Sequence, residues 1–171
     1  MQTMLHENIN GVDDGQGTDR LNYLRGDKFH EGVNNNYRPR TYILGDIINS
    51  APFYVESPPF EDAIDTGVPK TYPAFRTTYA GRANMLYVGA NDGMLHGFDT
   101  TGQERLAYAP GAVFKNLSRL TSRAYAHRYF VDGSPTVGDV YGDFGAQRCA
   151  PDSSCWRSVL VSGLGQGGQG V

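Results

Sequence analysis

The stretch from residue 85 to residue 102 constrains the fold more than any other part of the chain. An apolar run is followed by Asn91-Asp92-Gly93, then by a second short apolar run and by the turn-like Asp99-Thr-Thr-Gly102. Asn, Asp and Gly tolerate the positive φ angles that a tight hairpin turn requires. The sequence therefore predicts two antiparallel strands and the start of a third, at Gln103 to Ala109. A meander of short strands at this spacing is typical of a β-propeller blade or a β-sandwich.

Further strands are predicted on both sides of this meander. We expect strand, turn and strand within Thr41 to Val55, and strands at Tyr129 to Val131, Thr136 to Tyr141 and Trp156 to Ser162. A turn at Asp132-Gly133-Ser134-Pro135 precedes the second of the later strands. Strands outnumber helices, so the chain is predicted to be mainly β, a partial β-propeller with short helical insertions.

Three short segments have helical patterns. Asp19 to Arg25 carries apolar residues at 21, 23 and 24, with Thr18 or Asp19 as the expected N-cap and Gly26 at its end. We expect one or two helical turns between Pro69 and Arg82, and apolar residues recur at helical spacing in Ala112 to Ser122. The chain thus divides into a polar lead-in with a short helix, residues 1–40, and a partial propeller, residues 41–171.

The length of the chain suits only part of a propeller. A WD40-type blade takes about 40–45 residues, and residues 81–171 would therefore hold roughly two blades of a ring that needs about four to eight. We expect this chain to be a piece of a larger protein. Such a piece has unpaired strand edges, which favour aggregation.

Charge and hydropathy exclude two classes of function. The 15 basic and 18 acidic residues nearly balance, which argues against nucleic-acid binding driven by phosphate contacts. No apolar run reaches the roughly 18 residues of a membrane span. Met1 to Asn10 lacks the basic and apolar regions of a signal peptide. The protein is therefore either cytoplasmic or begins upstream of this sequence. We favour an upstream start, because we expect this chain to be a piece of a larger protein.

Cys149 and Cys155, the only cysteines, lie in one loop with five residues between them. This spacing fits neither a C-x-x-C redox motif nor a four-ligand zinc site. Two interpretations stay open: free thiols in a cytosolic loop, or a disulfide across the tip of a hairpin in an exported protein. We favour the disulfide, because the two cysteines flank one turn and none is left over. It indicates a periplasmic or extracellular protein.

Two segments have the residues of a ligand site but not its pattern. Gly163 to Gly168 matches G-x-G-x-x-G after a strand, but no βαβ alternation precedes it, so a flexible glycine turn is the favoured interpretation. Asp13, Asp14 and Asp19 lie in a Gly-rich loop without the EF-hand order, which favours a solvated acidic loop.

The remaining polar residues suggest no active site. The histidines show no ligand spacing and are expected to be packed or at the surface; they are His6, His30, His96 and His127. Asn91-Asp92-Gly93 and Asp132-Gly133 contain carboxylates that turn chemistry explains. We assign no catalytic, cofactor-binding or metal-binding residue.

Five blocks of sequence, taken together and in order, resemble one family. They are Arg20 to Asp27 (RLNYLRGD), Leu44 to Pro52 (LGDIINSAP), Leu86 to Asp99 (LYVGANDGMLHGFD), Tyr129 to Thr136 (YFVDGSPT) and Trp156 to Gly170 (WRSVLVSGLGQGGQG). They look like the start of the C-terminal β-propeller domain of the PilC/PilY type IV pilus tip-associated adhesins. The resemblance implies a modified propeller, secretion, and a role in pilus assembly, retraction control and adhesion.

The resemblance also implies partners and a location. The partners would be pilins and minor pilins, together with host or surface receptors, and the protein would not be an enzyme. It would be extracellular or at the cell surface, associated with the pilus at the outer membrane or fimbrium. The family's calcium site, a loop of D-x-[ND]-x-D type, has no match in this sequence, so calcium is expected only elsewhere in the full-length protein. Arg25-Gly26-Asp27 spells an adhesive tripeptide, but a C-cap glycine before an acidic residue explains it.

Two alternatives come from other classes of protein. Residues 87–102 also resemble the repeat of quinoprotein dehydrogenases, propeller enzymes that bind pyrroloquinoline quinone with calcium. Those enzymes often carry adjacent cysteines, unlike Cys149 and Cys155. The other alternative is an outer-membrane assembly scaffold built on a propeller, without a link to pili.

Overall fold

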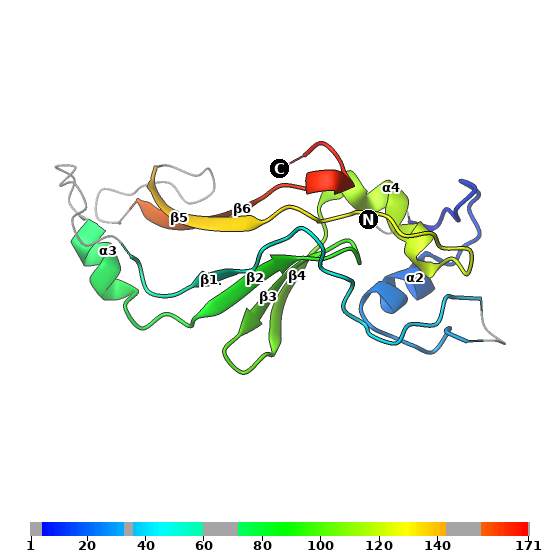
Figure 1. The fold of residues 1–171 in the computed structure, drawn as a ribbon, viewed down its shortest axis with the longest axis horizontal. Coiled ribbons are helices and arrows are strands. Elements are labelled where there is room, and N and C mark those ends of the chain that lie inside the picture. Colours follow the sequence, from blue (N-terminus) through cyan, green and yellow to red (C-terminus); the bar gives the residue numbers. More distant parts are fainter. Residues whose placement is uncertain (1–4, 33–35, 60–71, 143–154, 171) are drawn as a thin grey trace.

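The computed structural model describes residues 5–32, 36–59, 72–142 and 155–170. They form an elongated molecule with two antiparallel sheets and short helices (Figure 1). The four-stranded sheet has the order β1-β2-β3-β4, with β1 at Phe53–Val55, β2 at Met85–Gly89, β3 at Leu95–Asp99 and β4 at Glu104–Tyr108. The second sheet pairs β5, Pro135–Tyr141, with β6, Trp156–Ser162. Strand β5 contacts β1 and β2, so the two sheets lie side by side.

The predicted meander is confirmed, and its first turn is built on one glycine. The N–H of Ala90 donates to the carbonyl of Met94 at 3.0 Å, which closes a loop of three residues between β2 and β3. Gly93 has a φ of 95°, and every positive φ among the described residues belongs to a glycine. Asn91 and Asp92 are therefore not needed for positive φ angles, and their side chains are free for other contacts.

The second turn of the meander is held by a carboxylate. Asp99 Oδ1 accepts the backbone N–H groups of Thr101 at 2.9 Å and Gln103 at 3.0 Å. The hydroxyl of Thr101 and the guanidinium of Arg105 also donate to Asp99 and hold the pKa of this carboxyl well below its usual range.

Two predicted strands are not strands. In Thr41 to Val55 only β1 forms, because the backbone of the earlier half bonds to a turn instead of to a neighbouring strand: the Gly45 N–H donates to a side chain of that turn, and Asp46 O accepts the N–H of Asn91 at 3.0 Å. Tyr129 to Val131 is also irregular. Its N–H groups bond to the same turn, at Asn91 Oδ1 and Ala90 O. Within the described residues the sheets do not close into a ring.

The three predicted helical segments are confirmed. They are α2 at Gly17–Leu24, α3 at Tyr72–Thr78, and α4 at Phe114–Leu117 flanked by the 3-10 turns η1, Gly111–Val113, and η2, Ser118–Thr121. Among the described residues, no helix is long and apolar enough to cross a membrane.

The predicted N-cap of α2 is wrong. The capping position is Gln16, and no side chain caps it. Asp14 instead accepts the N–H of Gln16 at 3.1 Å and forms an ion pair with the buried Arg20. At the other end, Gly26 has a φ of 103° and donates its N–H to Tyr23 O, as a glycine that ends a helix does.

The main core lies at the α2 and α4 end of the molecule. It combines residues from the lead-in, the meander, α4 and the glycine-rich turn: Leu5, Tyr23, Leu24, Tyr37, Leu95, Val113, Leu117, Leu120, Phe130, Val131 and Leu164. Residues before position 40 thus share one core with residues after it. The division of the chain at residue 40 stays a prediction.

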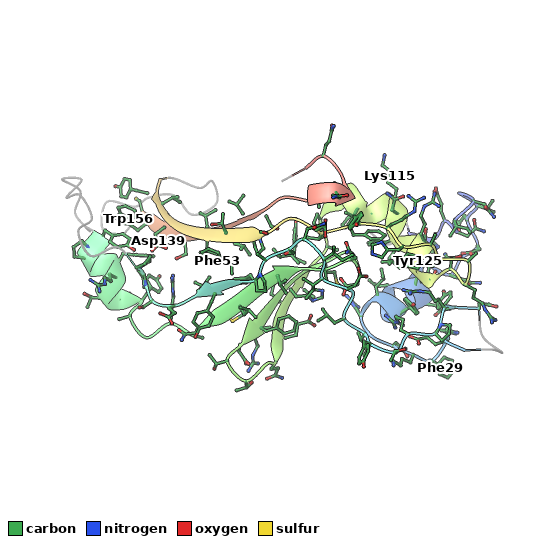
Figure 2. All side chains as sticks on the ribbon, in the orientation of Figure 1. Phe29, Phe53, Lys115, Tyr125, Asp139 and Trp156 are labelled. Carbon is green, nitrogen blue, oxygen red and sulfur yellow. The ribbon has the colours of Figure 1, made fainter. Side chains whose placement is uncertain are left out.

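An aromatic cluster lies at the opposite end, around α3. The ring of Tyr72 packs edge-on against Trp156 at 4.7 Å between centroids, and its hydroxyl donates to Asp139 Oδ2 at 2.6 Å. Figure 2 shows Asp139 and Trp156 together beside α3, far from Tyr125 and Phe29 at the α2 end. These contacts attach α3 to the β5–β6 sheet.

Candidate functional site

Four segments that are far apart in the sequence meet between the two sheets. They are residues 45–51, 90–93, 130–134 and 163–167, and we call their meeting place the junction. The first of these segments makes little regular structure of its own. Its polar groups bond instead to residues 89–92 and 132–134.

Two aspartates supply many of those partners. Asp92 Oδ2 accepts the N–H of Gly45 at 2.7 Å. Asp132, which is 2% exposed, accepts the N–H of Asn49 at 3.1 Å and its side-chain amide at 2.7 Å. Both aspartates lie in turns predicted from sequence, and both bind a segment that lies over 40 positions earlier in the chain.

Asn91 joins three of the four segments. It is 2% exposed, its amide nitrogen donates to Asp46 Oδ2 at 3.1 Å, and its amide oxygen accepts the N–H of Phe130 at 3.0 Å. The carboxylate of Asp46 also lies 2.8 Å from His127 Nε2. Burial would raise the pKa of Asp46, but the hydrogen bonds from Asn91 and His127 lower it below its usual value.

Ser50 makes a further connection across the junction. Its hydroxyl donates to the carbonyl of Gly133 at 3.0 Å and accepts the N–H of Gly89 at 2.8 Å. The N–H of Ala51 donates to Ser134 Oγ at 2.9 Å. Residues 49–51 are therefore held by both the end of β2 and the turn that precedes β5.

Glycine is required where the backbones come closest. A Cβ atom on Gly133 would lie 2.1 Å from the carbonyl oxygen of Gly163, and one on Gly167 would lie 1.8 Å from that of Phe130. The N–H of Asp132 donates to Leu164 O at 3.1 Å. The predicted glycine turn contains the 3-10 turn η3, Gly165–Gly167, and its backbone lies close to the 130–133 backbone. Its flexibility stays a prediction.

His96 is packed beside the junction, as one of the two interpretations of the histidines predicts. It is 3% exposed and lies between Asp92 and Glu104. Burial by itself would lower the pKa of His96, but the two carboxylates raise it above its usual value.

The described residues offer no metal site. They contain no group of three or more His, Cys, Asp or Glu side chains placed to hold an ion. In the predicted acidic loop, Asp14 is engaged by Arg20, while Asp13 is exposed. The described part of the chain therefore offers no set of ligands for the calcium ion that the resemblance implies for the family, and a calcium site elsewhere in the full-length protein stays a prediction. Cys155 is buried at the start of β6, and Cys149 lies outside the described residues, so their disulfide stays a prediction.

The turn residues singled out in the sequence all reach the junction: Asn91, Asp92, Gly93, Asp132 and Gly133. Sequence reasoning explained them by turn chemistry alone and missed their partners Asp46, Asn49 and Ser50. One signal could have pointed to these partners. They lie in Leu44 to Pro52, which is one of the five blocks that carry the family resemblance although its composition is that of a turn.

The sequence blocks that carried the resemblance therefore converge in space. Blocks two to five supply the four segments of the junction. The first block contacts its surroundings through Tyr23, whose hydroxyl donates to Leu120 O at 3.2 Å. The arrangement provides a hydrogen-bonded polar connection between the two sheets.

Comparison with known proteins identifies the family of this chain. A family model described as the PilY1 beta-propeller domain matches residues 44–171, which include all four junction segments. The chain is 43% identical over 167 residues to the type IV pilus biogenesis factor PilY1 of Pseudomonas aeruginosa (strain PAK), covering 95% of this chain and 13% of that protein. It is 44% identical over 158 residues to a PilY1 homolog of Xylella fastidiosa (strain Temecula1 / ATCC 700964), covering 89% of this chain and 12% of that protein.

A solved structure is also similar. The crystal structure of the Pseudomonas aeruginosa PilY1 C-terminal domain is 36% identical, with a TM-score of 0.46, and the match covers 67% of this chain and 20% of that one. The chain spans only about an eighth of the length of the curated relatives it matches, since it covers 12% to 13% of them. From the match over residues 44–171, the chain belongs to the PilY1 beta-propeller domain family of type IV pilus biogenesis factors.

Proposed function

We propose that this chain is a structural, contact-making segment of a type IV pilus biogenesis factor. In this proposal it acts in pilus assembly, in the control of retraction and in attachment to surfaces. The observation that carries the proposal is the 43% identity to PilY1 over 95% of the chain. The similar proteins are named as pilus biogenesis factors, which favours this role over the quinoprotein dehydrogenase alternative.

The proposed partners are pilins and minor pilins, with receptors on a host or another surface as further partners, and the proposed location is the cell surface or the pilus itself. Exposed apolar side chains beside the junction support a contact role: Tyr42, Ile43, Leu44, Ile47 and Ile48. They belong to or adjoin the segment that the junction holds in place. Contiguous apolar side chains on a surface are typical of a protein interaction site.

Deletion and complementation test this function. In the organism that encodes the chain, we expect deletion of the gene to reduce surface pili and twitching motility. The wild-type gene should restore both, and so should Glu56→Gln, a change of one exposed residue outside the four junction segments. Unchanged piliation and motility in the deletion strain would contradict the proposal.

A further inference from the structure

The imidazole of His96 lies between two carboxylates. Its Nε2 atom is 3.1 Å from both carboxylate oxygens of Asp92, and its Nδ1 atom is 2.5 Å from Glu104 Oε1. An ionised carboxylate can only accept hydrogen bonds, and a neutral imidazole has a single N–H to donate. Only the protonated ring can therefore satisfy both contacts at once.

The two carboxylates are held very differently. Asp92 is largely buried, and its oxygens also accept the N–H groups of Gly45 at 2.7 Å and Met94 at 3.2 Å. The Glu104 side chain is 47% exposed at the first position of β4. When the ring loses a proton, the remaining N–H stays with the fixed Asp92, and Glu104 is the partner that can turn into water.

We propose that His96, Asp92 and Glu104 form a pH-sensitive clamp, which joins the 91–93 turn to strand β4 when the imidazole is protonated and releases β4 when the imidazole is neutral. Strand β4 is the last strand of the four-stranded sheet, and all five of its residues are exposed. The clamp thus controls the order of an edge strand, which is the part of a sheet most open to pairing with a partner.

The clamp also borders a cleft. A mainly apolar cleft of about 460 Å³ lies between α2 and the β3–β4 face, and Asp92, His96 and Glu104 line one side of it. The other charged group lining this cleft is Arg25, at the end of α2. Phe98, in the same strand as the imidazole, stacks on it at 5.9 Å and adds no charge. Release of Glu104 therefore changes both the edge of the sheet and the wall of the cleft.

The direction of the pH dependence follows from linkage. The pKa of His96 in the folded protein is raised above its ordinary value of 6.5, so protonated His96 stabilises the folded state. That contribution is complete below about pH 6.5 and is lost as the pH rises through the raised pKa. The clamp is therefore closed in mildly acidic surroundings and opens in alkaline ones.

Hydrogen exchange measured by mass spectrometry on the full-length protein that carries this chain tests the proposal. Deuterium uptake by peptides covering residues 98–108 would be measured at a series of pH values from about 6 to about 9. Each rate would be corrected for the known pH dependence of intrinsic amide exchange. We expect the protection of β4 to fall about two- to fivefold over this range, the size expected for a half-exposed ion pair.

Two variants and a control make the test specific. Glu104→Gln removes the charge and keeps the shape of the side chain, so the protection of β4 should no longer fall as the pH rises (the pH step). His96→Gln should give low protection at every pH. Glu56→Gln, at an exposed glutamate outside the cleft, should keep the wild-type step. A wild-type protection that does not change with pH, or a step that persists in Glu104→Gln, would overturn the clamp.

Discussion

Asp132 illustrates how the junction depends on single side chains. Its carboxylate is almost completely buried, and it accepts both the backbone N–H and the side-chain amide of Asn49. The presence of an aspartate in a turn is usually explained by the local backbone conformation. Here its side chain also accepts hydrogen bonds from a segment that is distant in the sequence. Removal of the carboxylate would leave two donors without an acceptor.

We therefore expect Asp132→Ala to lower the free energy of unfolding by about 2 kcal/mol, because a hydrogen bond to a charged group contributes roughly 1.5–3 kcal/mol. Asp13→Ala is the matched control, since Asp13 is exposed and bonds only within its own loop. Chemical denaturation of each variant measures the difference. Equal effects of the two substitutions would contradict the role given to Asp132.

Two glycines offer a second comparison at this scale. A methyl group on Gly133 would lie 2.1 Å from a backbone oxygen, whereas one on Gly138, in β5, would meet nothing within 4 Å. Gly133→Ala should destabilise the protein by about 1–3 kcal/mol, as overpacking does. Gly138→Ala should be neutral or stabilising by up to about 1 kcal/mol, since alanine restricts the unfolded chain. A shared midpoint of thermal unfolding would show that the close approach at Gly133 is not important.

Local patterns explain which residue contacts could be predicted from sequence. Asn91, Asp92 and Asp132 were identified because their types and order match those of turns. Their partners Asp46 and Asn49 could not be paired with them, since the contacts join positions more than 40 residues apart and no local periodicity encodes such pairs. The wrong N-cap of α2 has a different, local cause: Asp14 accepts the N–H of Gln16 from just outside the helix, and the helix begins before Thr18 and Asp19.

At the scale of elements, a strand was predicted correctly in the meander, where its pairing partner is the next strand along the chain. Strands β2, β3 and β4 pair with their neighbours in sequence, and all three were predicted. Tyr42 to Leu44 has strand-like residues but no adjacent strand to pair with, and Tyr42 is 80% exposed. Strand propensity alone therefore overestimated the regular structure before β1.

The disulfide between Cys149 and Cys155 is a prediction about one element, the connection between β5 and β6. In the chain-entropy model, closing a loop of this size would stabilise by about 2 kcal/mol. We expect a peptide pair linked through these residues when the full-length protein, isolated from cells, is digested without reductant and analysed by mass spectrometry. Alkylation of both cysteines before any reduction would contradict it.

At the scale of the whole molecule, the chain leaves much apolar surface uncovered. Large apolar side chains are exposed on β1, β4, β5, β6 and the segment before β1, for example Tyr42, Ile48, Tyr54, Tyr108 and Val161. The sequence indicated this, because the strand count suited roughly two blades of a larger ring. The curated relatives are much longer than this chain, which covers 13% of one and 12% of another.

We accordingly expect the isolated 171-residue chain to be marginally stable or to aggregate, since exposed strand edges and apolar side chains associate. Size-exclusion chromatography with light scattering, followed by a thermal melt, measures this. The same residues inside the full-length protein should be protected from proteolysis. A soluble monomer with a sharp, cooperative melt would count against the interpretation.

We propose that the junction gives this chain the fold with which it supports pilus formation. The most direct test replaces the chromosomal gene by Gly133→Ala or by Gly138→Ala and measures the pilin sheared from the cell surface. We predict that surface pilin falls strongly in the Gly133→Ala strain and stays at the wild-type level in the Gly138→Ala strain. Equal, wild-type amounts of surface pilin in both strains would contradict the account.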